Sequence, residues 1–280
     1  MILYFVLCLN KAGNLRAQVA KEITNSIGMK LVLISKGTFT MGSPVTEADR
    51  FTDEGEHEVT LTRDYYLGKF EVTQQEFKEV MGYNESRFKE SPLLPVEGVH
   101  WYDAVMFCNK LSELDGYPAS YNISEVKKDG ESIVHANVEL ISNAAGYRLP
   151  TEAEWEYGCR GGSKMAYSFG ANKQLLVDYG WYKDNSDLKT HLVGQKKPNA
   201  WGLYDMHGNV WEWCWDWYDE YPNVSVLDPI GPSTGEFRVF RGGSYNFQAA
   251  LSRAALRDRF PPKHSICGFR VVLSPSEKNK

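Results

Sequence analysis

The chain has 280 residues, a formal net charge of −5, 42% hydrophobic residues and 24% charged residues, which is typical of a globular protein with an ordinary core. Nucleic acid is disfavoured as a partner, because phosphate binding usually requires a basic surface. The sequence contains no Rossmann glycine motif, P-loop or HExxH motif, which argues against nucleotide-dependent and zinc-hydrolase chemistry.

Residues 1–24 are predicted to be a leader and a linker. The apolar run at 1–7 is too short to span a bilayer. It is compatible with the apolar part of a signal peptide, although no positive charge precedes it, and Cys8 is then a candidate lipidation site. The alternative is an ordinary N-terminal strand. Export predicts a place at the cell surface or outer membrane, with a lipid on Cys8 as the expected link to a membrane.

Alternating and apolar segments predict strands in the first part of the domain. Residues 29–34 and 37–42 are expected to form two strands joined by a turn. A charged loop at 47–58 follows, and residues 59–62 and 65–72 predict a second strand pair.

Helices are predicted from their start and stop signals. Thr73 and Glu76 form a capping box, and the helix that they begin is expected to stop at Gly82. A second helix fits residues 102–114, with an apolar face that includes Cys108. The five cysteines form no CxxC pair, and Cys108 is predicted to be a buried, inert thiol.

Residues 117–146 are expected to be irregular apart from a hairpin at Asp129-Gly130. A second capping box at 151–154 predicts a short helix that ends before residue 161. No repeat or clear linker divides the rest of the chain, so residues 25–280 are predicted to form a single α+β domain.

Four tryptophans alternate with other residues at positions 211, 213, 215 and 217. Period-2 spacing places their indoles on one face of a strand. A buried core face is the favoured interpretation, and a sugar-stacking platform is the alternative. Just upstream, Asp205, Gly208 and Glu212 offer oxygen ligands of the kind that calcium prefers, without EF-hand spacing. His207 is predicted to be a turn residue bonded to backbone.

The last forty residues combine a regular frame with irregular contents. Arg241-Gly-Gly-Ser244 and 268–272 enclose side chains that follow neither a helical nor a strand period. Small residues and arginines separate them. The thirteen irregular positions, called display positions below, are Tyr245, Asn246, Phe247, Gln248, Leu251, Leu256, Asp258, Arg259, Phe260, Lys263, His264, Ser265 and Ile266. They include the residue types that antibody loops use, which favours a binding surface.

Several motifs in the same order resemble one family. They are residues 28–43 (GMKLVLISKGTFTMGS), 147–161 (YRLPTEAEWEYGCRG), 202–213 (GLYDMHGNVWEW), RGGS at 241–244 and GFR at 268–270. Together they resemble the formylglycine-generating enzyme, or sulfatase-modifying factor, domain over about residues 25–275. This resemblance implies a C-type lectin fold with a twisted antiparallel sheet, two main helices and much irregular loop.

The resemblance also has consequences for chemistry. In the oxygen-dependent enzyme, two cysteines after the Gly-Gly-Ser-Tyr motif bind copper, and they correspond to Phe247 and Ser252 here. Neither residue is a ligand for Cu(I), so the protein is predicted not to be an enzyme and to require no cofactor. The family's calcium ligands fall on Asp205, Gly208, Val210 and Glu212, which leaves a structural calcium ion as an expectation.

The variable region, residues 241–272, resembles that of proteins diversified by a retroelement, such as the Treponema variable proteins. In those systems adenine replacement turns asparagine codons into a limited set of others. Eleven display positions hold residues of that set, whereas Gln248 and Lys263 do not. The resemblance implies a cell-surface protein that recognises a macromolecule, either a protein or a surface glycan. The alternatives are a catalytic or degenerate member of the enzyme family and a structural subunit of a surface apparatus.

Overall fold

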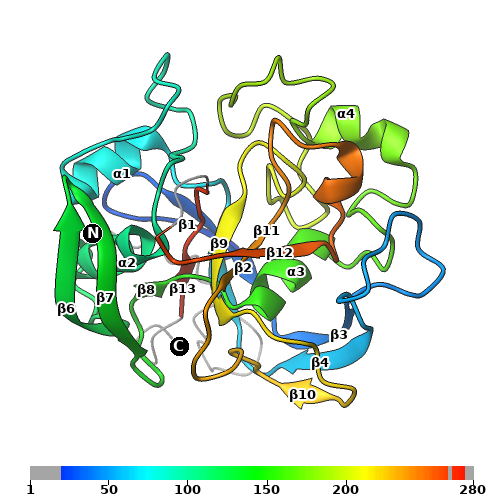
Figure 1. Cartoon of the computed structure of the whole chain (residues 1–280), viewed down its shortest axis with the longest axis horizontal. Helices are drawn as coiled ribbons and strands as arrows, with labels where there is room; N and C mark the ends of the chain where they lie inside the picture. The colour runs from blue at the N-terminus through cyan, green and yellow to red at the C-terminus, as the bar shows by residue number, and fades with distance from the viewer. Residues whose placement is uncertain (1–19, 264–266, 275–280) are drawn as a thin grey trace, which may run out of the picture.

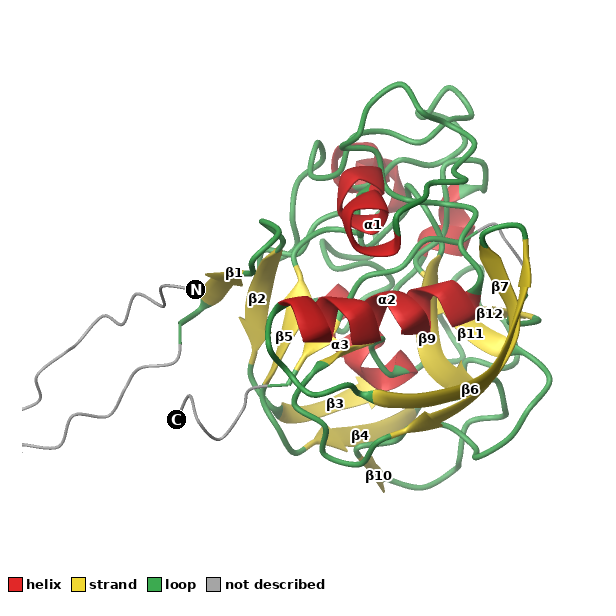
Figure 2. Ribbon diagram, turned by 90° about the vertical axis from the view of Figure 1, so that its left-hand side faces the viewer, coloured by secondary structure: helices red, strands yellow, loops and turns green. Residues whose placement is uncertain are grey.

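The computed structural model describes residues 20–263 and 267–274. The predictions for the leader up to residue 19, for Cys8 and for display positions 264–266 therefore lie outside the described residues. The predicted boundary of the domain at residue 25 is too late, because Glu22–Thr24 form strand β1, which pairs with Lys30–Val32. The described part is a mixture of short helices, several sheets and long loops, as the α+β prediction required (Figures 1 and 2). Within it, no helix combines the length and apolarity needed to cross a membrane.

The first sheet has the strand order β1-β2-β5-β13-β8, with neighbouring strands antiparallel. These strands are Glu22–Thr24, Lys30–Ile34, Tyr65–Gly68, Val272–Leu273 and Tyr147–Arg148. Its central strand, β5, is buried along its whole length. The end of the variable region is thus part of this sheet, through β13.

Two further three-stranded sheets complete the frame. One has the order β10-β4-β3, formed by Val226–Leu227, His57–Leu61 and Gly37–Met41. The other has the order β12-β11-β9, formed by Arg257–Phe260, Arg238–Arg241 and Glu212–Trp217. In Figure 1 this last sheet crosses the centre of the molecule.

A long hairpin and the helices surround these sheets. Strands β6 (Tyr121–Asp129) and β7 (Ser132–Leu140) form the hairpin, which curves round helix α2 in Figure 2. The helices are α1 (Gln74–Met81), α2 (Trp101–Leu114), α3 (Glu152–Arg160) and α4 (Leu176–Tyr179), with 3-10 turns at Lys173–Leu175 and Ala249–Ser252. The hairpin is longer and more regular than predicted.

Both predicted capping boxes are present. The hydroxyl oxygens of Thr73 and Thr151 accept hydrogen bonds from the backbone three residues later, and the glutamates there accept bonds in return. The α1 helix ends at Gly82, whose φ of 89° is favourable only for glycine. These local signals were sufficient to place α1 and α3, whereas the short helix α4 was not predicted.

The predicted strand pairs are wrong in their partners. β2 and β3 follow one another in the chain but belong to different sheets, and so do β4 and β5. Instead, β2 pairs with β5, and β3 pairs with β4. Each short connection therefore crosses between sheets, and the two sheets pack together through a shared core cluster to which all four strands contribute, including Ile34, Met41, Val59 and Leu67.

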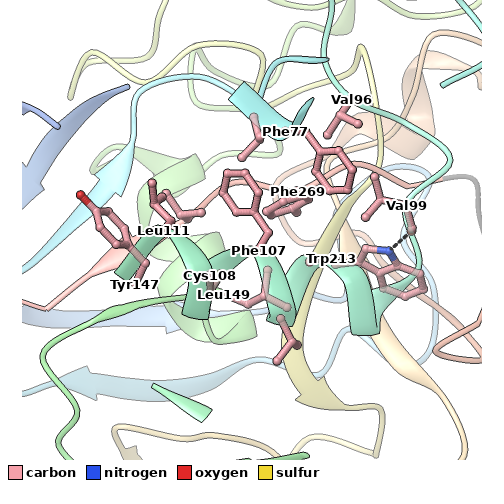
Figure 3. Close-up of a cluster of buried hydrophobic side chains, with 14 of the residues drawn as sticks. Phe77, Val96, Val99, Phe107, Cys108, Leu111, Tyr147, Leu149, Trp213 and Phe269 are labelled. Carbon is pink, nitrogen blue, oxygen red and sulfur yellow. Dashed lines mark hydrogen bonds between the residues drawn. The ribbon is translucent and has the colours of Figure 1, made fainter. Parts of the chain in front are cut away.

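The larger core lies between α2 and the central strands. Phe107 stacks parallel to Phe77 and meets the edge of Phe269, with ring centroids 5.8 and 5.2 Å apart (Figure 3). Trp213 donates its indole N–H to the Val99 carbonyl at 2.8 Å, and Cys108 is fully buried beside them. Burial raises the pKa of the Cys108 thiol, which agrees with the inert role predicted for it.

The tryptophan series is a core face only in part. Trp211 and Trp213 are buried, whereas Trp215 and Trp217 are partly exposed and flank the Arg238 guanidinium. On the opposite face of β9, Cys214 packs into the second core cluster. Strand β9 is therefore covered on both sides, and it supports the variable region through its pairing with β11.

Candidate functional site

The variable region folds as an excursion between two paired strands. Arg241, at the end of β11, is opposite Arg257, at the start of β12, in an antiparallel ladder that continues to Arg238 and Phe260. The residues between Arg241 and Arg257 therefore begin and end at the same place. This pairing converts an aperiodic sequence into a closed loop with fixed ends.

Other parts of the chain hold the backbone of this excursion. The carbonyl of Tyr245 accepts a bond from the Ser186 hydroxyl at 2.5 Å, and the carbonyl of Phe247 accepts one from the backbone of Lys183 at 2.9 Å. Tyr167 donates its hydroxyl to the Ala249 carbonyl at 3.0 Å. These bonds use main-chain atoms of the excursion, so they do not depend on which side chains it carries.

The buried side chain of His207 also holds the backbone of the excursion. The backbone N–H of Ser168 donates to Nε2 of His207 at 3.0 Å, so the ring proton is assigned to Nδ1, which donates to the Ser252 carbonyl at 2.8 Å. Burial lowers the pKa of His207 to about 4, which keeps the ring neutral in this arrangement. The prediction that His207 is bonded to backbone is confirmed.

Four buried arginines anchor the region to the rest of the domain. Arg241 pairs with Glu152 and Glu156 and also donates to the carbonyls of Ala254 and Ala255. Three further pairs are bidentate: Arg253 with Glu54, Arg257 with Glu152, and Arg270 with Glu212, with nitrogen–oxygen distances of 2.5 to 2.8 Å. The sequence placed Arg241 and Arg270 in the frame and Arg253 and Arg257 in the scaffold between display positions, but it did not indicate their carboxylate partners.

The described display positions mostly lie on the surface. The side chains of Asn246, Gln248, Asp258, Arg259 and Lys263 are exposed, and those of Tyr245, Phe247, Leu251 and Phe260 are half-buried. Arg259 lies over the ring of Tyr218, 4.0 Å from its centroid. Nine of the described positions are therefore exposed or half-buried, and they lie in two segments, 245–251 and 258–263, that the buried residues 252–257 separate.

Leu256 is the exception, and its assignment as a display position needs correction. Its side chain is only 2% exposed and belongs to the larger hydrophobic core. The residue stands between Ala255 and Arg257, which are also buried, at the point where the excursion re-enters the sheet. A ligand in contact with the surface does not reach it in this conformation.

Phe247 and Ser252, which were matched to the enzyme's copper ligands, offer no metal chemistry. The Phe247 ring packs edge-on against Trp211 at 5.6 Å, and the Ser252 hydroxyl is buried with no hydrogen-bond partner among the described residues. The described cysteines are all buried and unpaired, and burial raises the pKa of Cys159. A protonated, buried thiol is a poor nucleophile and metal ligand.

The four expected calcium ligands fit an ion in part. Asp205 is buried, and its Oδ1 has no hydrogen-bond partner among the described residues, whereas Oδ2 accepts the backbone N–H of Gly194 at 2.7 Å. Both carboxylate oxygens of Glu212 are instead bonded to Arg270, and one also accepts the indole N–H of Trp155. No three His, Cys, Asp or Glu side chains converge on a metal position in the described ranges. Asp205 Oδ1 would therefore be the free side-chain ligand of the four residues.

A pocket that the sequence did not indicate adjoins the variable region. It has a volume of about 290 Å³ and lies between the loop that follows α1 and the tip of the β6–β7 hairpin. Its lining residues are Glu85, Arg87, Glu97, Gly98, His100, Asp129, Ser132 and Val134. These residues are spread over fifty positions of the sequence, so no local sequence motif predicts the pocket.

Known proteins share this organisation. The family model for the sulfatase-modifying factor enzyme 1-like domain matches residues 16–275 of this chain. The chain is 36% identical over 239 residues to the chaperone protein LppX of Paenibacillus barcinonensis, covering 77% of this chain and 78% of that protein. It is 30% identical over 283 residues to the formylglycine-generating enzyme of Mus musculus, covering 87% and 74%.

Among solved structures, variable protein 1 of Treponema denticola superposes with a TM-score of 0.82 at 34% sequence identity, covering 92% of this chain and all of that one. This similarity shows that the fold is the C-type-lectin-like fold of the formylglycine-generating enzyme family, as the sequence motifs implied. The match to the family model extends through the excursion between β11 and β12 to the end of β13. The chain belongs to the sulfatase-modifying factor enzyme 1-like domain family.

Proposed function

We propose that the protein is a non-enzymatic binding protein that recognises a macromolecular ligand through the display positions of its variable region. One observation carries this proposal: the backbone of residues 245–256 is held by main-chain bonds and buried arginine pairs, while five of its six display side chains are exposed or half-buried. Such a loop can change its side chains without losing its shape. Rigid presentation also lowers the entropy lost on binding.

The types of side chain support a macromolecular ligand. Tyr245, Phe247 and Phe260 supply half-buried rings that are already partly immobilised, and Asn246 and Gln248 supply adaptable amide groups. Aromatic anchors and small polar groups are the combination that antibody paratopes use. The similarity to a protein named as variable supports the further proposal that a retroelement diversifies these positions.

The non-enzymatic part of the proposal follows from Phe247 and Ser252. If they occupy the positions of the enzyme's copper ligands, no sulfur is available there. The competing function is catalysis, which the name of the mouse relative favours. Oxidation of a cysteine-containing peptide with copper and oxygen distinguishes the two: we expect no turnover, and turnover that is lost in Ser252→Ala would establish the competing function.

A library tests the proposed function directly. Asn246, Gln248, Asp258 and Arg259 are randomised together, and the folded variants are selected against several unrelated proteins. We expect most variants to fold and separate selections to yield different side chains at these positions. A control library randomises Arg241, Arg253, Arg257 and Arg270, and we expect it to yield few folded members. Equal loss of folding in the two libraries would contradict the proposal.

We further propose that the protein is exported and acts at the cell surface. The support is the similarity to LppX and to the Treponema denticola protein, together with the apolar segment that precedes Cys8. Labelling of intact cells with a membrane-impermeant reagent tests this, and protection from the reagent until lysis would contradict it.

A further inference from the structure

The two separate segments of display positions meet over one pair of buried rings. Phe247 forms a T-shaped contact with Trp211, with ring centroids 5.6 Å apart, and Phe260 stacks on Phe240 at 4.9 Å. Trp211 and Phe240 also form a T-shaped contact, at 4.9 Å, so the four rings make an unbroken row. The two inner rings, Trp211 and Phe240, are called the aromatic floor below.

The aromatic floor belongs to the constant part of the domain. Trp211 and Phe240 are each only 1% exposed. Phe240 lies in β11 between Trp213 of β9 and Asp258 of β12, and the carbonyl of Trp211 accepts the backbone N–H of Gly268 at 2.8 Å. Neither residue of the floor is a display position. The floor therefore stays the same when the display side chains change.

The two display rings cover the floor from positions whose backbone is held without the help of the side chain. The N–H of Phe247 donates to the Ser244 carbonyl at 3.0 Å, and the carbonyl of Phe247 accepts the N–H of Lys183 at 2.9 Å. Phe260 lies opposite Arg238 in the ladder between β12 and β11. A smaller side chain at either position should leave a space over the floor, because a fixed backbone relaxes only partly into a vacated volume.

The floor also contains a polar group without a partner. The indole N–H of Trp211 is buried and has no hydrogen-bond acceptor among the described residues. By contrast, the equally buried Trp213 donates its indole N–H to the Val99 carbonyl at 2.8 Å. A buried donor that lacks an acceptor costs free energy, which a ligand that supplies the acceptor recovers. The best ligand for the floor is therefore an apolar ring that carries an oxygen.

We propose that the aromatic floor is a binding pocket for a tyrosine side chain of a protein ligand, closed in this chain by Phe247 and opened by a small side chain at position 247. The proposal rests on the proposed function for its protein ligand. The volume that Phe247 vacates is that of one phenyl ring, which a tyrosine ring fills while its phenolic oxygen accepts the Trp211 N–H. The residue at 247 thus determines whether this surface presents a ring to its ligand or receives one.

The experiment titrates the full chain with p-cresol, which is the side chain of tyrosine, and with toluene, which lacks the hydroxyl group. The variants are Phe247→Ser and Phe247→Asn, and the indole N–H signals in proton–nitrogen NMR spectra report binding. Both variants should bind p-cresol saturably and at least about tenfold more tightly than the wild-type protein, because a ring becomes buried. The Trp211 signal, assigned with Trp211→Phe, should shift most.

The hydrogen bond is tested by adding Trp211→Phe to Phe247→Ser. Phenylalanine keeps an aromatic floor but removes the donor, so the ratio of p-cresol to toluene affinity should fall at least about threefold. The matched control is Phe51→Ser, the same change at a half-exposed ring in the loop between β3 and β4, which should leave p-cresol binding within about twofold of the wild-type value.

Three results would overturn the proposal: equal p-cresol binding by the wild-type protein and Phe247→Ser, no saturable binding by the folded Phe247 variants, or an unchanged affinity ratio in the double variant. Unfolding of both Phe247 variants would also overturn it, because Phe247 would then be a core residue and not a cover. Failure of the library selection with retained p-cresol binding would contradict the proposed function alone.

Discussion

Arg253 forms a bidentate ion pair with Glu54, a residue 199 positions away in the sequence, with nitrogen–oxygen distances of 2.7 and 2.5 Å. Both side chains are almost completely buried, and Glu47 supplies a second carboxylate to the same guanidinium. The pair joins the middle of the variable region to the loop between β3 and β4. Together with the other arginine pairs, it connects the excursion to distant segments of the domain, and these contacts fix its conformation.

Breaking this pair should destabilise the protein strongly. Arg253→Gln leaves the Glu54 carboxylate buried without its cation, and we expect the free energy of unfolding to fall by about 3–5 kcal/mol. Urea denaturation measures this change. The control is Lys173→Gln, which removes an exposed pair with Asp49 and should cost less than about 1 kcal/mol. Similar losses for the two variants would show that the buried pair is not an anchor.

Display and core positions should respond differently to truncation. Each of Asn246→Ala and Gln248→Ala should change the free energy of unfolding by less than about 0.5 kcal/mol, because their side chains are exposed. Leu256→Ala should reduce it by about 2–5 kcal/mol, because it leaves a cavity in the core. The denaturation midpoints of the three variants test this. If Leu256→Ala lowers the free energy of unfolding by less than about 1 kcal/mol, Leu256 is a display position and not a core residue.

The stability should depend on the protonation of Asp216. Burial, reinforced by the Glu152 charge, raises the pKa of Asp216 to about 8 from an ordinary value near 3.8. Between these values the folded protein keeps a proton that the unfolded chain has lost. The stability contributed by this proton is therefore full below about pH 4 and is lost as the pH rises through about 8, with a slope of the order of 1 kcal/mol per pH unit.

Asp216→Asn isolates this effect, because asparagine does not titrate and its amide oxygen can still accept the Glu152 backbone N–H. Urea denaturation at pH 5 and pH 8 compares the two proteins. We expect the stability of the wild-type protein relative to the variant to fall between these pH values. A constant difference would mean that Asp216 is ionised throughout the range.

Calcium should stabilise the protein if Asp205 Oδ1 is a ligand. A ligand that binds only the folded state raises the melting temperature according to its free concentration and dissociation constant. We expect millimolar calcium to raise the melting temperature more than magnesium does, because calcium accepts irregular oxygen ligands more readily. Asp205→Gly tolerates the positive φ of 60° at this position and should abolish the shift. An equal response to both ions, or an unchanged shift in the variant, would exclude the site.

Local features of this structure were predictable from the sequence, and long-range pairings were not. Thr73 and Thr151 correctly predicted where α1 and α3 begin, because a capping box involves residues only three positions apart. The pairing of β2 with β5 and of β3 with β4 could not be read from the local sequence. Each strand has the same apolar pattern whichever sheet it belongs to. The motifs identified the fold because five of them occur in one order over about residues 25–275.

In the candidate site, too, local features were predictable and long-range contacts were not. The irregular chemistry of the variable region pointed to most of its surface side chains, but Leu256 belongs to the same codon set and is part of the core. The partners of Arg241 and Arg253 come from distant segments, as do Glu97 and Asp129 of the pocket. Only the folded chain brings them together.

The most direct test of diversification at the display positions is the sequence of the variable region in several isolates of the source organism. We expect differences concentrated at the display positions, with Arg241, Arg253, Arg257, Arg270 and Leu256 unchanged. We also expect a reverse transcriptase gene and a near-identical template copy beside the gene. Uniform sequences, or changes spread equally over the arginines and the display positions, would contradict diversification.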